Sequence, residues 1–240
     1  MFRTVVSFVS LCGLLWQRDR WLEGRTRAGR AGLLLGALLA VVIAGILFQP
    51  GRVLGVTSSS GGAVVNMLPG LLWASFLVAG GWTLWRGIDA ERENSALHDL
   101  LLAPIDPGAF FLARVLVSTA RLMPGLLLLA AVLIFLYGGG WPRGPLALAG
   151  ALGLGLLGLT ATGLLILYLT AAVHGRELLF PLLWISLTLP VLAAVVVLTG
   201  AALGGEAIFL AGPWWRLLLV YDGIMLGAGW LLFGYVVEEV

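Results

Sequence analysis

The segment from Arg86 to Pro107 reads RGIDAERENSALHDLLLAPIDP and separates two long apolar runs. Its charged residues are Arg86, Asp89, Glu91, Arg92, Glu93, Asp99 and Asp106. Crossing a bilayer takes about 20 apolar residues, and the run on either side is long enough to do so. We therefore expect the segment to lie at a membrane surface between two membrane-spanning helices.

The second half of this segment has the pattern of an amphipathic helix. Leu97, Leu100 and Leu101 are spaced at i, i+3 and i+4, which places them on one apolar stripe. We predict a cytoplasmic coupling helix whose stripe docks a soluble partner, with the charges of 91–93 setting the orientation of that partner. A helix resting at the lipid interface is the alternative, although an acidic cluster suits an anionic leaflet poorly.

The composition of the chain sets its class. It has 240 residues, of which 60% are hydrophobic and 11% charged, with a mean hydropathy of +1.05. Soluble domains are roughly half apolar and a quarter charged, so this composition indicates an all-α integral membrane protein. We expect residues 1–240 to form a single transmembrane domain.

The chain contains no lysine, because all 14 basic residues are arginine. A phosphate-binding loop of the GxxxxGK[ST] type is therefore excluded, as is Schiff-base chemistry on lysine. If ATP drives this protein, another protein has to bind it. The single cysteine, Cys12, excludes disulfides within the chain.

Six membrane spans are predicted, near residues 31–49, 64–85, 115–137, 146–171, 178–200 and 216–236. Residues 1–30 are predicted to form an interfacial amphipathic helix followed by a basic collar. A signal peptide is the alternative, but the apolar stretch runs into Gln-Arg-Asp-Arg instead of a small-residue cleavage site. Only Arg52, Arg143 and Arg216 fall in the predicted outer loops, so the positive-inside rule places both termini in the cytoplasm.

Local signals add detail to this bundle. Asp106-Pro107 is typical of a helix start, with Asp as the N-cap and Pro at the first helical position. The stretch Gly150–Gly163 reads GALGLGLLGLTATG and predicts a close-packing face, either within the bundle or between protomers. Six tryptophans near span ends are predicted to anchor at the interface: Trp73, Trp82, Trp85, Trp141, Trp214 and Trp215.

Ionisable residues inside a membrane are candidates for function, and two qualify, Arg121 and Asp222. Arg121 follows Arg114 by seven residues on the same helix face and can extend its head group to the inner interface. Asp222 lies near the outer end of the last predicted span. We favour an interfacial position for both residues, with an intramembrane role as the alternative.

Signatures of catalysis and cofactor binding are absent from the sequence. There is no GxSxG motif, and Ser75, Ser118 and Ser186 are predicted to hydrogen-bond between helices. His98 and His174 are the only histidines, and neither belongs to HExxH. We expect a non-catalytic subunit that binds no cofactor, and we assign its arginines to topology rather than to nucleic acid.

Four stretches, in order and spacing, resemble the heme exporter protein B (CcmB) family. They are Pro69–Trp73, the 91–104 stretch with its Glu-Arg-Glu and Leu-Leu-Leu-x-Pro elements, Leu187–Pro190, and 221–239 from Tyr-Asp to Val-Val-Glu-Glu. The chain departs from the family pattern at Ser95, where glycine is usual, and at His98, where glutamate is common. Both departures lie in the predicted docking segment.

The resemblance implies a six-helix bundle of the ABC-2 exporter type in the bacterial inner membrane. It implies a permease-like subunit, present in two copies, of the ABC complex in cytochrome c maturation. Its partners would be a CcmA-type ATPase, CcmC, CcmD and the heme chaperone CcmE, with ATP bound in the ATPase and heme as cargo. A generic ABC-2 exporter permease for a lipid, polysaccharide or drug is the alternative. A secondary transporter or intramembrane enzyme is disfavoured, because deep ionisable residues are few.

Overall fold

The computed structural model describes residues 12–13, 17, 61–93, 106–135, 142–170, 175–204 and 212–238. These residues contain helices and no strand. The helices are α4 (Gly61–Glu93), α6 (Pro107–Leu133), α7 (Pro145–Leu169), α8 (Arg176–Gly204) and α9 (Gly212–Glu238). Three isolated residues near the N-terminus, Cys12, Gly13 and Gln17, are also helical.

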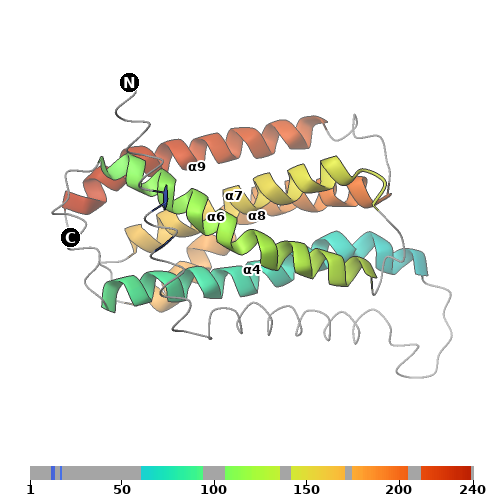
Figure 1. Ribbon diagram of the computed structural model, residues 1–240, viewed down its shortest axis with the longest axis horizontal. Helices are drawn as coiled ribbons and strands as arrows, with labels where there is room; N and C mark the ends of the chain where they lie inside the picture. Colours follow the sequence, from blue (N-terminus) through green and yellow to red (C-terminus); the bar gives the residue numbers. More distant parts are fainter. Residues whose placement is uncertain are drawn as a thin grey trace.

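The five helices lie side by side along the long axis of the molecule (Figure 1). Successive helices run in opposite directions, so α4, α7 and α9 point one way and α6 and α8 point the other. α7 contacts each of the other four helices and is the most buried of them. α4 and α9 lie on opposite sides of α7 (Figure 1).

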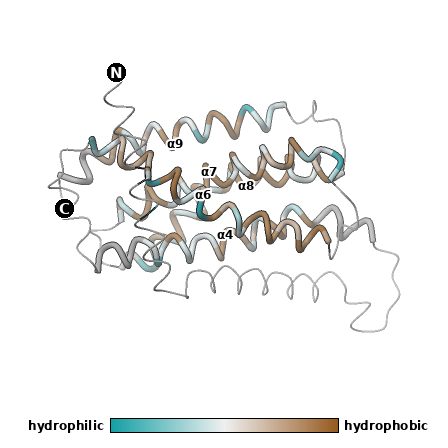
Figure 2. Tube along the Cα trace, in the orientation of Figure 1, coloured by the Kyte–Doolittle hydropathy of each residue, from teal (hydrophilic) through white to brown (hydrophobic). Residues whose placement is uncertain are grey.

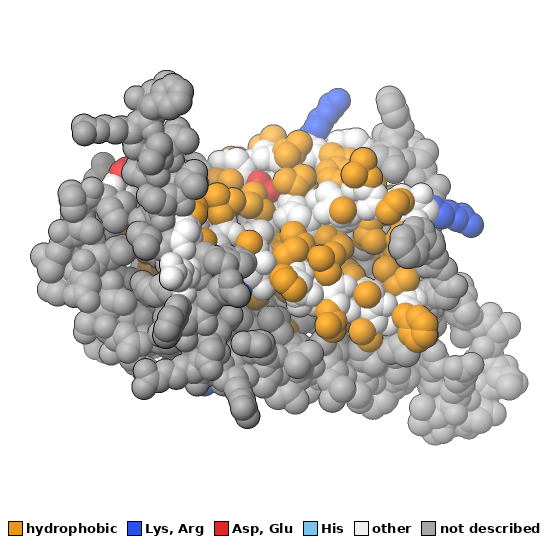
Figure 3. Space-filling model, in the orientation of Figure 1, with side chains coloured by type: hydrophobic (Ala, Val, Ile, Leu, Met, Phe, Trp, Pro, Cys, Tyr) orange, Lys and Arg blue, Asp and Glu red, His pale blue; other side chains and the backbone are white. Residues whose placement is uncertain are grey.

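Each of these helices contains an apolar stretch long enough to cross a membrane: Leu68–Gly87, Pro107–Leu133, Pro145–Leu169, Glu177–Gly204 and Gly212–Phe233. Brown, apolar segments run along most of the described helices in Figure 2. Apolar side chains also cover much of the described surface in Figure 3. A surface of this kind belongs in lipid rather than water. The chain is therefore an integral membrane protein, as its composition predicts.

The observed helices refine five of the six predicted spans. Asp106 is the N-cap of α6, because its Oδ2 accepts a hydrogen bond from the backbone N–H of Ala109 at 3.2 Å. Pro107 is the first helical residue, which confirms the predicted start. α4 does not end with its predicted span but continues through Arg86 to Glu93. The predicted span 31–49 and most of the predicted N-terminal helix lie outside the described residues.

The glycine-rich face of α7 packs inside the bundle, which decides between the two predicted alternatives. A Cβ atom at Gly155 would collide with Val195 of α8 and would lie 2.6 Å from Cη2 of Trp73 on α4. A Cβ atom at Gly163 would lie 2.9 Å from Cδ1 of Leu84. These glycines let α4 and α8 approach α7 closely, as small residues do between membrane helices.

Trp73 shows that the interfacial assignment of the tryptophans does not hold throughout. Its side chain is fully buried, and its indole N–H donates a hydrogen bond to Oγ1 of Thr199 on α8 at 3.0 Å. Trp73 is thus a core residue, because Gly155 leaves room for its ring between α4 and α8. Trp82, nine residues further along α4, is exposed.

The predicted serine contacts between helices are wrong for the two serines whose hydrogen bonds are resolved. Ser75 donates to the carbonyl of Leu71 on its own helix, and Ser186 does the same to Leu182. Threonines make such contacts instead, as in the 2.6 Å hydrogen bond between Thr119 of α6 and Thr160 of α7.

Candidate functional site

Two buried charged side chains, Arg114 and Asp222, stand out in the described part of the bundle, each only 3% exposed. Charges inside a membrane protein are costly and mark functional sites by default. Arg114 belongs to α6 and faces residues of α4 and α7, and Asp222 belongs to α9. We therefore treat the side chains around Arg114 and those around Asp222 as two clusters that make up the candidate site.

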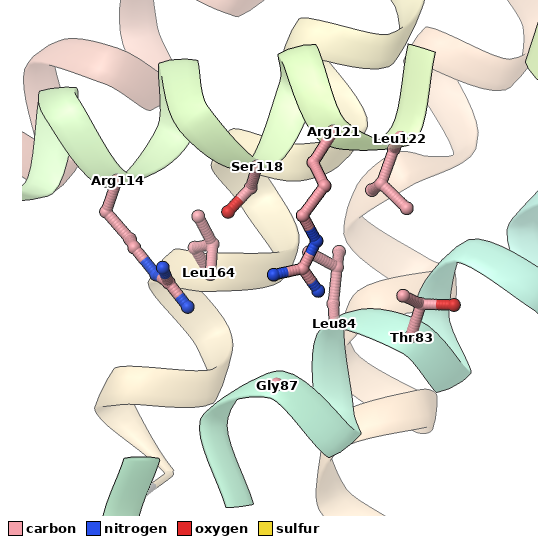
Figure 4. A pocket seen from close by; sticks show the side chains of 8 residues that line it. All are labelled: Thr83, Leu84, Gly87, Arg114, Ser118, Arg121, Leu122 and Leu164. Atoms are coloured by element: carbon pink, nitrogen blue, oxygen red, sulfur yellow. The ribbon is translucent and has the colours of Figure 1, made fainter. Parts of the chain in front are cut away.

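The first cluster is an arginine-lined hollow. Arg114, Ser118 and Arg121 follow one another at intervals of four and three residues, so α6 presents them on one face. Figure 4 shows the three side chains projecting from α6 toward α4 and Leu164 of α7. The hollow has a volume of about 10 Å³, room for about one water molecule.

The hollow adjoins the end of the apolar stretch of α4. Thr83, Leu84 and Gly87 of α4 complete its lining. A Cβ atom at Gly87 would lie 3.9 Å from Nη2 of Arg121, so the guanidinium faces α4 at this position. Fixed positive charge therefore lies where α4 leaves its apolar stretch. Guanidinium groups at such a point favour carboxylate or phosphate partners.

The second cluster surrounds Asp222, halfway along the apolar stretch Gly212–Phe233. The prediction that Asp222 lies at the outer interface is wrong, since its side chain is buried against Gly158 of α7. A Cβ atom at Gly158 would collide with Oδ1 of Asp222 and would lie 3.5 Å from Cγ2 of Val191 on α8. Glycine at position 158 leaves space for the carboxyl group, and a larger residue there would force it to shift.

The carboxyl group of Asp222 has no hydrogen-bond partner among the described residues, at either oxygen. Its neighbour Tyr221 is better connected. Oη of Tyr221 lies 3.0 Å from Oγ1 of Thr162 on α7 and 2.9 Å from the carbonyl oxygen of Leu187 on α8. Oγ1 of Thr162 also lies 2.8 Å from the carbonyl oxygen of Gly158. Polar contacts thus join three helices beside an unpartnered acid.

The structure describes only some of the predicted docking residues. Glu91, Arg92 and Glu93 belong to the last turn of α4, which ends at Glu93. Leu97, Leu100 and Leu101 lie outside the described residues, as do His98 and His174, so the docking helix stays a prediction. Within the described ranges, no group of three or more His, Cys, Asp or Glu side chains gathers as a metal site.

Besides the buried position of Asp222, sequence reasoning missed the burial of Arg114. Its seven-residue spacing from Arg121 places both on one face, but that spacing alone does not say whether the face meets lipid surface or another helix. Nothing else in the sequence distinguishes the two cases.

Comparison with protein families gives one result. Residues 11–227 match the family model described as CcmB protein. The match covers most of the chain and includes both polar clusters. No curated protein matches the chain.

Proposed function

This chain belongs to the CcmB family, whose members are permease-type membrane subunits of heme export for cytochrome c maturation, and we propose that it transmits the work of a CcmA-type ATPase into the membrane. ATP has to be bound by that partner, because the chain has no lysine for a phosphate-binding loop. The conformational change driven by ATP hydrolysis then has to reach this chain through a contact between the two proteins, and residues 86–107 are the candidate for that contact.

The observation that carries this proposal is the length of α4. The helix has 33 residues, which corresponds to about 50 Å at about 1.5 Å per residue. Its apolar stretch, Leu68–Gly87, has 20 residues and accounts for about 30 Å, the thickness of the hydrocarbon core. α4 therefore extends past the membrane as an uninterrupted helix into the charged segment, so displacement of that segment moves the span itself.

Inside the bundle, Trp184 of α8 connects α4 to α7. Its ring lies against Gly81 of α4 and Gly163 of α7, where added Cβ atoms would meet it. Its indole N–H donates to the carbonyl of Leu159 on α7 at 3.2 Å. Phe180 stacks on Trp184 with ring centroids 5.4 Å apart and is tilted against Trp85 of α4 at the same separation. A tilt of α4 therefore displaces α7 and α8 as well.

The arginine-lined hollow adds a second connection, between α6 and the part of α4 at which the charged segment begins. Arg121 and Gly87 line the same hollow, and the segment that follows Gly87 carries acidic residues. When this segment moves, the electrostatic environment of Arg114 and Arg121 changes. α6, which carries both arginines, then shifts together with α4.

The remaining parts of the proposal concern partners and cargo. The subunit works in the inner membrane, in two copies, with the CcmA-type ATPase, CcmC, CcmD and the heme chaperone CcmE. Hydrolysis drives heme delivery to the periplasmic side or release of the heme-loaded chaperone. Heme is cargo of the complex, and this chain holds none by axial ligation. The family match supports this assignment over a generic lipid, polysaccharide or drug exporter.

Co-purification of the ATPase with variants of the docking segment tests the proposal. Leu100→Asp places a charge in the apolar stripe, and a buried unpaired charge costs about 3 to 5 kcal/mol, so capture of the ATPase should fall at least tenfold. Leu102→Asp is the matched control, because Leu102 projects away from the stripe on a helix, and it should retain capture. Equal capture by the two variants, both inserted in the membrane, would refute the docking assignment.

A further inference from the structure

Asp222 is a buried acid that the proposed coupling function does not use. It lies 3% exposed where α7, α8 and α9 meet. Its carboxyl group occupies a space that Gly158 leaves on α7. Neither carboxyl oxygen has a hydrogen-bond partner among the residues that the structure describes. The chain thus keeps an acid in its interior with space made for it and no partner supplied.

A carboxylate in this place lacks compensation from the helices around it. α7 contributes Gly158 and Thr162 and has no Asp, Glu, Lys, Arg or His between Pro145 and Leu169. α8 contributes Val191, and its charged residues in the described range, Arg176 and Glu177, are at its far end.

The groups on α9 and α6 supply no counter-charge either. On α9, Tyr221 is the neighbouring titratable group, and Arg216 lies six residues earlier with its side chain exposed. α6 packs on α9 further along, where Gly229 receives Phe111. The two arginines of α6 line the hollow toward α4 (Figure 4). An ionised carboxyl group without a partner or water is strongly disfavoured. We therefore infer that Asp222 is uncharged while the junction where α7, α8 and α9 meet stays closed.

The hydroxyl groups beside Asp222 form an adjustable contact. Tyr221 and Thr162 make three short contacts, to each other and to the carbonyls of Leu187 and Gly158. Two hydroxyl protons cannot serve all three contacts at once, so the pair can distribute its protons in more than one way. Tyr221 can donate to the Leu187 carbonyl of α8 while accepting from Thr162 of α7, or it can donate to Thr162, whose own proton then goes to the Gly158 carbonyl. The junction can therefore be rearranged without breaking every polar contact.

We propose that Asp222 is a proton-binding site whose occupancy controls the contact between α7 and α9. With the proton bound, the neutral acid fits under Gly158 and the helices close. When the proton leaves to water, the resulting carboxylate requires hydration, and α7 and α9 separate at this level to admit it. The bundle thereby gains a proton-dependent step that is separate from ATPase docking and does not rest on it.

Two measurements on the full chain in lipid nanodiscs test this proposal. The first is infrared difference spectroscopy of wild type against Asp222→Asn, a substitution of nearly the same size. At neutral pH the difference should contain the C=O band of a protonated carboxylic acid assigned to Asp222. A difference made only of ionised carboxylate bands would overturn the proposal.

The second measurement is the distance between spin labels on the exposed positions Ala149 of α7 and Leu219 of α9, in a Cys12→Ser background. In wild type the distance should lengthen by about 2 Å or more between about pH 5 and about pH 9. Asp222→Asn carries no titratable proton there and should keep the short distance throughout. A wild-type distance that ignores pH, or an Asp222→Asn distance that follows pH as wild type does, would contradict the proposal.

Discussion

Substitution of Gly155 by alanine tests the close packing of α7 against α4 and α8. The added Cβ would collide with Val195 and would lie 2.6 Å from Cη2 of Trp73, whose ring is fully buried and cannot swing into lipid. Gly153 lies on the same helix, two residues earlier, and its added Cβ would meet only Cε of Met123 at 3.9 Å. Gly153→Ala is therefore a matched control.

The expected difference follows from comparing the two variants. Both replace glycine by alanine inside a helix, so both gain the same intrinsic helix propensity of about 1 kcal/mol, which cancels. What remains is the overpacking at Gly155, which costs about 1 to 3 kcal/mol. A displaced Trp73 also loses its hydrogen bond to Thr199, for which about 0.6 kcal/mol is typical in membrane proteins.

Reversible unfolding in mixed detergent and lipid micelles, followed by tryptophan fluorescence, measures this difference. We expect Gly155→Ala to have a lower free energy of unfolding than Gly153→Ala by about 1 to 3 kcal/mol. Equal stability of the two variants would refute the packing of α4 and α8 across Gly155. It would also remove the basis for placing Trp73 in the core.

Two further predictions concern topology and cargo. Cysteines placed at Ser58 and Ser95 should react with an impermeant thiol reagent from opposite sides of the membrane, and reaction from the same side would contradict the alternating topology. Partial burial raises the pKa of the native Cys12 thiol, which lowers its thiolate fraction and slows its reaction at neutral pH, but Cys12 should still be replaced. The chain purified without partners should show no stoichiometric low-spin heme spectrum, and such a spectrum with histidine-like ligation would refute the proposal that this chain holds no heme by axial ligation.

The sequence predicted those features that depend on local chemistry. Asp106 and Pro107 mark a helix start by the hydrogen-bonding capacity of one and the fixed backbone angle of the other, and the structure has the helix beginning there. The glycine-rich stretch Gly150–Gly163 predicted a close-packing face without requiring knowledge of its partners. Apolar length located five of the spans to within a few residues at most ends.

The sequence could not predict which face of each helix turns inward. A membrane helix is apolar on all sides, so it lacks the polar stripe that identifies the exposed face of a soluble helix. The burial of Trp73 and Asp222 depends instead on glycines of the neighbouring helix α7, at positions 155 and 158. These pairs are distant in the sequence, and only the assembled bundle brings them together.

The continuity of α4 between the membrane and the docking segment is the central claim, and Ile88→Pro tests it most directly. Proline at position 88 removes a backbone donor and its ring clashes with the carbonyl of Leu84, which costs about 3 kcal/mol or more in a helix interior. Ile88→Ala keeps the helix and is the control. The measurement is the yield of c-type cytochrome in cells that depend on this chain, with ATPase capture recorded in parallel. We predict that Ile88→Pro captures the ATPase at the wild-type level but loses cytochrome assembly, while Ile88→Ala retains both. Wild-type cytochrome assembly in Ile88→Pro cells would contradict the account.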